Sequence, residues 1–200
     1  MDSETARSDR PALAASLMTA GGAVVVIATF MSWFFLRSGL EEGSIKGADI
    51  SVGFGVLLIA AIATILGMVH WARAETSSGK VTAILVIVLF AIVGVLSVYA
   101  IVAPADALAT FAAADVSEQV AVWDTVPEES LRQAILAGDV SVVTEPGLYA
   151  IAVGAAVGLF GGIVGLVRAR GAHRRVVLAS RERPEKQDEA HEHAAAERSA

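Results

Sequence analysis

The sequence contains no cysteine, and none of its four long apolar segments has a charged residue in its interior. Without cysteine, the loops have neither a disulfide framework nor a thiolate metal site. Without interior charges, the segments lack the ionisable groups that proton relays and ion pumps carry at membrane depth. The G-x-S-x-G, H-E-x-x-H and P-loop motifs do not occur either. We therefore expect a protein that is not an enzyme and that holds no cofactor and no metal.

The chain is rich in long apolar runs, and its mean hydropathy is +0.63. A helix needs about 20 apolar residues to cross the hydrocarbon core of a bilayer. This length predicts an all-α membrane protein with four transmembrane helices in an up-down bundle, forming a membrane domain over 11–167. The first apolar run is too long for the core of a cleaved signal peptide. The predicted spans are Pro11–Leu36, Ile50–Val69, Val81–Ala103 and Pro146–Val167.

The distribution of the 15 basic residues predicts the orientation of the chain. Cytoplasmic segments of membrane proteins carry an excess of Lys and Arg. Only three basic residues, Arg37, Lys46 and Arg132, fall in the two loops that would lie outside if the N-terminus is cytoplasmic. We expect a protein of the bacterial plasma membrane with both termini in the cytoplasm: a tail over 1–10 and a basic, then disordered tail over 168–200. A cluster after span four would anchor the topology or bind lipid headgroups: Arg168, Arg170, Arg174 and Arg175.

The long outer loop over 104–145 contains a helix signature. Thr125 and Glu128 form a capping box, and Gly138 is a natural stop, which predicts a short amphipathic helix near Pro127–Ala137. A second short helix near Pro104–Ala114 and an extended stretch over Val140–Thr144 are also expected. Either the helix is a lid over the bundle in a solvated acidic loop, or the loop docks a partner or a cationic ligand on the outer side. The candidate docking residues are Glu128, Glu129, Leu131, Arg132 and Ile135.

Span four carries a stripe of glycines with three overlapping G-x-x-x-G matches. Such stripes let two helix backbones approach closely in lipid. The pattern predicts a packing face, either against the other spans of the same chain or against a second copy or another subunit. The face comprises Gly147, Gly154, Gly158, Gly161, Gly162 and Gly165.

Aromatic residues stand at three predicted span ends, and one histidine lies beside one of them. Trp33, Trp71 and Tyr149 are the aromatic side chains that an interfacial belt would contain. His70 has no neighbouring acid or second histidine in the sequence, so we interpret it as an interfacial residue and not as a metal ligand.

The order of these features resembles small four-span membrane proteins of unassigned function in actinobacteria. The likeness rests on Ser32-Trp33-Phe34 at the outer end of span one, the short basic loop after span two, the longer outer loop, and the glycine-spaced span that begins with Pro146-Gly147. It covers Pro11–Val167 and implies no active site.

By exclusion, the sequence favours a non-enzymatic accessory or scaffolding component of an envelope membrane complex. Its expected surroundings are the lipid bilayer and a membrane-protein partner or further copies of itself, with no nucleic acid. The alternative is a subunit of an oligomeric channel or transporter, although no span shows the polar stripe that lines a wet path.

Overall fold

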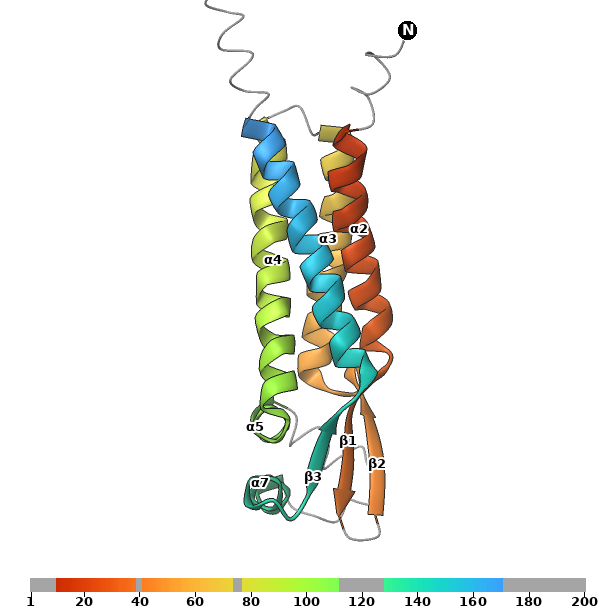
Figure 1. Ribbon diagram of the computed structural model, residues 1–200, viewed down its shortest axis with the longest axis vertical. Coiled ribbons are helices and arrows are strands. Elements are labelled where there is room, and N and C mark those ends of the chain that lie inside the picture. The colour runs from red at the N-terminus through yellow and green to blue at the C-terminus, as the bar shows by residue number, and fades with distance from the viewer. Residues whose placement is uncertain (1–9, 39–40, 74–76, 112–127, 171–200) are drawn as a thin grey trace, which may run out of the picture.

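The computed structural model describes residues 10–38, 41–73, 77–111 and 128–170. Figure 1 shows four long helices side by side, with a small sheet and two short helices at one end. The long helices are α2 (Arg10–Thr29), α3 (Ser51–Arg73), α4 (Ser77–Val102) and the last helix, Pro146–Arg170. All four are long and apolar enough to cross a membrane, which agrees with the number of spans expected from the sequence.

The first helix ends seven residues earlier than the predicted span Pro11–Leu36, so that boundary is wrong. The last helical residue is Thr29, and the next two backbone N–H groups, of Phe30 and Met31, bond the carbonyls three residues earlier. The chain then enters strand β1 (Ser32–Ser38). Its apolar run continues past the helix because aromatic residues suit a half-buried strand and β1 buries Trp33, Phe34 and Leu36.

A three-stranded antiparallel sheet corrects the all-α prediction. Strand β1 lies in the centre, between β2 (Glu41–Lys46) and β3 (Ser141–Thr144). Phe35 is opposite Ser44 on one side and Val143 on the other, and Arg37 is opposite Glu42 and Ser141. The strand β3 falls within the stretch Val140–Thr144 that the sequence indicates as extended. The sheet thus joins the first connecting segment to the residues just before the last helix.

Two short helices accompany the sheet, α5 (Pro104–Phe111) and α7 (Glu128–Ala137). Both lie beside β3 at the sheet end of the molecule (Figure 1). We call the three strands, these two helices and the short 3₁₀ helix Gly47–Asp49 the sheet subdomain. Its buried core is one continuous apolar cluster with the bundle, and from the subdomain it includes Phe34, Leu36, Ile45, Leu108, Ile135 and Val140.

Gly138 ends helix α7 in the way that the sequence indicates. Its φ is +84°, in the left-handed region that favours glycine. Asp139 N–H bonds the carbonyl of Ala134, and Gly138 N–H bonds that of Ile135. These two bonds form a Schellman motif, which turns the chain directly into β3. The predicted cap Thr125 lies outside the described residues.

Candidate functional site

The last helix meets α2 closely enough for their backbone atoms to be in contact. A Cβ built on Gly21 of α2 would lie between 2.5 and 2.7 Å from Gly158 N, Gly158 Cα and the Gly154 carbonyl oxygen. One turn further along, a Cβ on Gly161 would lie 2.8 Å from the backbone nitrogen of Met18. We call this line of contact the glycine seam. No larger residue fits here, and van der Waals contact between the two backbones contributes to the stability of the helix pair.

The glycines of the predicted face also contact other elements of the same chain. A side chain at Gly158 would overlap the ring of Phe90 on α4, and one at Gly162 would overlap Ile87. Gly165 adjoins His70 and Met18, while Gly147 adjoins Trp33 and the carbonyl oxygen of Ser32. The structure therefore brings all six glycines against α2, α3, α4 or β1. Packing within the chain accounts for the stripe.

Trp33 joins the bundle to the sheet subdomain, a role that the belt prediction missed. Its side chain is 4% exposed, and the indole N–H donates to the carbonyl of Ala28, 3.0 Å away. Gly47 and Gly147 flank the ring so closely that a side chain on either would overlap or crowd it. Trp33 is therefore not at a lipid interface. By contrast, Trp71 and Tyr149 are 67% and 50% exposed, as belt residues are.

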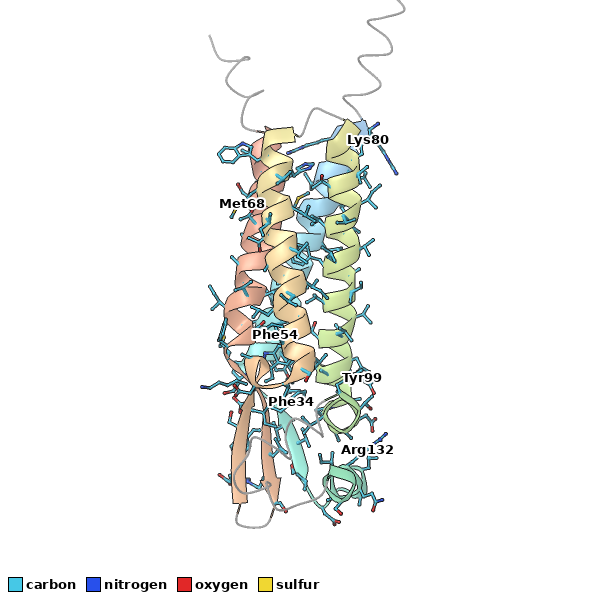
Figure 2. All side chains as sticks on the ribbon, turned by 180° about the vertical axis from the view of Figure 1, so that it is seen from behind. Phe34, Phe54, Met68, Lys80, Tyr99 and Arg132 are labelled. Carbon is cyan, nitrogen blue, oxygen red and sulfur yellow. The ribbon has the colours of Figure 1, made fainter. Side chains whose placement is uncertain are left out.

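The residues proposed for partner docking on α7 differ in their exposure to solvent. Ile135 is 2% exposed and belongs to the core, so a partner cannot reach it. Arg132 points away from the sheet (Figure 2) and is exposed. The positions of Glu128, Glu129 and Leu131 on α7 are described, but their side chains are not. Leu136, an apolar residue of this helix, is 55% exposed.

No described element of the chain covers one face of the sheet. Along β1 and β3, Phe34, Leu36 and Val142 turn toward the core, and the intervening residues turn outward. The outward side carries half-buried Phe35 beside Val143, which is 52% exposed. Arg37 pairs with Glu42 at 2.7 Å next to them, and its guanidinium lies 5.9 Å from the Phe35 ring centre. We call Phe35, Arg37, Glu42 and Val143 the open sheet face.

The two ends of the molecule differ in charge. At the end away from the sheet, every long helix supplies a basic residue: Arg10, Arg73, Lys80, Arg168 and Arg170. The predicted anchors Arg174 and Arg175 lie outside the described residues. The sheet end carries acidic residues, among them Glu42, Asp49 and Asp106 on strands and helices and Asp139 in the turn after α7. We call the end away from the sheet, which carries Arg10, Arg73, Lys80, Arg168 and Arg170, the basic end.

His70 is the one buried ionisable side chain in the described part of the chain, at 2% exposed. Its Nδ1 atom has no hydrogen-bond partner there, and its Nε2 atom faces the bare backbone of Gly165. The described residues contain no group of three or more His, Cys, Asp or Glu that could hold a metal ion. The ring of His70 packs beside Gly165.

A small cavity lies where the bundle meets the sheet subdomain. Its volume is about 30 Å³, and it is lined by Phe34, Val56, Val93 and nine other apolar residues, with Ser97 as its polar member. Ser97 donates its hydroxyl to the carbonyl of Gly94 at 3.0 Å. A space of this size holds about one water molecule, so it is no ligand site.

Comparison of the chain with protein-family models, with curated proteins and with solved structures found no match. The open sheet face, the basic end and the helix surfaces therefore have to be interpreted from their own chemistry.

Proposed function

We propose that this chain is a multi-pass protein of the bacterial plasma membrane that acts as a non-enzymatic accessory or scaffolding component of an envelope membrane complex. Its four apolar helices form an up-down bundle, with the amphipathic helix in the loop between spans three and four. Both termini lie in the cytoplasm. The basic end supports this orientation, because Lys and Arg collect on the cytoplasmic side. The resemblance to actinobacterial four-span proteins belongs to the same proposal.

The open sheet face is the observation that carries the contact role. In the proposed orientation it stands outside the membrane, where lipid cannot cover its apolar residues. Val143 is 52% exposed beside Phe35, and a charged pair borders them. An apolar centre with an aromatic residue and an arginine beside it has the composition of a protein–protein contact.

The sheet subdomain also suits such a role because two of its strands connect directly to membrane-spanning helices. The β1 strand continues directly from α2, and β3 continues into the last helix, where Glu145 N–H bonds the carbonyl of Trp33 at 2.9 Å. A contact surface held by two spans transmits a bound partner's position to the bundle. This is the property that a scaffolding component needs.

Site-specific photo-cross-linking in native membranes tests the proposal. A photoreactive amino acid at Val143 should yield one discrete adduct, whereas the same probe at Ala137, an exposed residue of α7, should yield much less. Val143→Glu should abolish co-purification of the adduct's partner while leaving the amount of this protein unchanged. Equal adducts at both positions would contradict the role of the open sheet face. A closed ring of copies with ion flux in liposomes would favour the channel alternative.

A further inference from the structure

Helix α2 carries an open groove on the side that adjoins α3. Its volume is about 530 Å³, and two residues of α3, Met68 and Trp71, form one wall. Figure 2 shows Met68 on the half of α3 nearer the basic end, beside α2. The other wall consists of small residues of α2: Ala12, Ala15, Ser16, Thr19, Ala20 and Ala23. The groove is apolar and opens to the surface that the bilayer surrounds.

The groove is as long as one leaflet of a bilayer. From Ala12 to Ala23 a helix rises by roughly 16 Å at about 1.5 Å per residue. Half of a hydrocarbon core of about 30 Å is roughly 15 Å. The groove starts near the basic end and therefore stops near the middle of the membrane.

Bulky side chains continue the same helical stripe beyond the groove. Ile27, four positions after Ala23, is 66% exposed, and Phe30, three positions after Ile27, is 58% exposed. A second membrane helix lying along this stripe would be held off by these two side chains. A chain that enters from one leaflet and ends at the midplane would meet only the small residues. This difference favours a lipid tail over a protein helix.

Two basic residues mark the open end of the groove. Helix α2 begins at Arg10, and α3 ends at Arg73, so the backbone positions of both residues are at the membrane boundary where a headgroup would lie. Basic sites between membrane helices on the cytoplasmic side bind anionic headgroups, and each Lys or Arg near the surface contributes to that attraction. Trp71, 67% exposed, provides an interfacial ring at the same level.

We infer that the groove between α2 and α3 binds one anionic phospholipid, with an acyl chain along the small residues of α2 and the phosphate at the two helix ends that carry Arg10 and Arg73. The inference rests on the membrane placement proposed above and not on the contact role of the open sheet face. Failure of the cross-linking experiment would leave it intact, because the two surfaces lie at opposite ends of the molecule.

Native mass spectrometry of the protein in mild detergent, titrated with phosphatidylglycerol or with phosphatidylcholine of the same chains, tests this site. The wild type should bind one phosphatidylglycerol more tightly than phosphatidylcholine. Arg10→Gln with Arg73→Gln should reduce that preference about 30-fold, since about 1 kcal/mol for each arginine corresponds to about fivefold. Lys80→Gln is the matched control: Figure 2 places Lys80 at the same end, on α4 and away from Met68.

A second pair of variants tests the groove itself. Ala20→Leu with Ala23→Leu fills it with side chains from two exposed positions and should weaken binding of both lipids. Ala156→Leu, on an exposed position of the last helix, should change neither. Equal affinity for the two lipids, or unchanged binding in the filled variant, would overturn the inference. A wild-type dimer that disappears in the filled variant would also overturn it, because a second copy would then occupy the groove.

Discussion

The glycine seam and the sheet subdomain are both tightly packed, but opposite features of their sequences produce the packing. Along the seam, Gly21, Gly154 and Gly158 contribute no side chains, and the backbones themselves are in contact. In the subdomain, large side chains such as Trp33, Phe34 and Leu108 fill the space between strands and helices. The seam lies between apolar helices, whereas the subdomain lies beyond the end of these helices. The surroundings of the two regions therefore differ, and with them the kind of contact that stabilises each one.

Lipid tails are as apolar as leucine, so burying a leucine between two membrane helices gains little. Close backbone contact gains dispersion energy that lipid cannot supply equally well, and glycine permits it. In water, removing apolar surface is itself favourable, by about 25 cal/mol per Å². Adding atoms should therefore break the seam, and removing atoms should break the subdomain.

Adding atoms to the seam should have the largest effect. Gly158→Leu places a side chain against the ring of Phe90 and beside the α2 backbone, where neither neighbour can withdraw without separating the helices. We expect a loss beyond the usual range of about 1–3 kcal/mol for overpacking, and hence little folded protein. Fluorescence-detected gel filtration of a tagged variant in mild detergent measures it.

Gly55→Leu is the matched control for that change. A Cβ on Gly55 meets no heavy atom within 4 Å, so the same substitution on another membrane helix should leave the elution profile like that of the wild type. Leucine is also a better helix former than glycine. If both variants behaved alike, the loss at Gly158 would reflect hydrophobicity or expression and not contact along the seam.

The sequence revealed the seam but not its partner, for a physical reason. The spacing of Gly154, Gly158 and Gly161 is a property of one helix, and a period of three to four shows that a face exists. Which surface covers that face depends on contacts with Gly21 and Phe90, far away in the chain. The same limit applied to the groove, because Ala12, Ser16 and Ala20 alone do not show whether α3 covers them.

The sheet was missed because its strands looked like other structures. Trp33–Leu36 extends an apolar run and was included in the first span, although its aromatic residues favour a strand. A better signal was available: β1 and β2 are separated by two residues, of which the first is Gly39, and a two-residue loop with glycine first is typical of hairpins. The pairing of β1 with β3, about a hundred residues later, leaves no local trace.

Removing atoms from the junction should have an intermediate effect. Trp33→Phe keeps an aromatic ring but deletes the N–H that donates to Ala28, and it leaves a gap between Gly47 and Gly147. The Ala28 carbonyl still accepts from Met31 N–H, so it is not left unpaired. We expect a loss of about 1–3 kcal/mol, from one hydrogen bond and part of a ring.

Thermal unfolding in detergent measures that loss, and Trp71→Phe is its control. Trp71 is 67% exposed, so the same substitution there should leave the midpoint almost unchanged. Equal midpoints for the two variants would show that Trp33 does not hold the sheet subdomain on the bundle.

Changing charge on the open sheet face should have the smallest effect. Arg37 and Glu42 pair at 2.7 Å, but their side chains are 61% and 50% exposed, and water screens such pairs. Glu42→Gln should cost less than about 1 kcal/mol in the purified protein, and added salt should reduce even this. The measurement is the unfolding midpoint at low and high salt. A larger cost in native membranes than in detergent would mean that a partner covers the face there and removes the water. A large cost in detergent would mean that the pair is already shielded, and the open sheet face would no longer be a free surface.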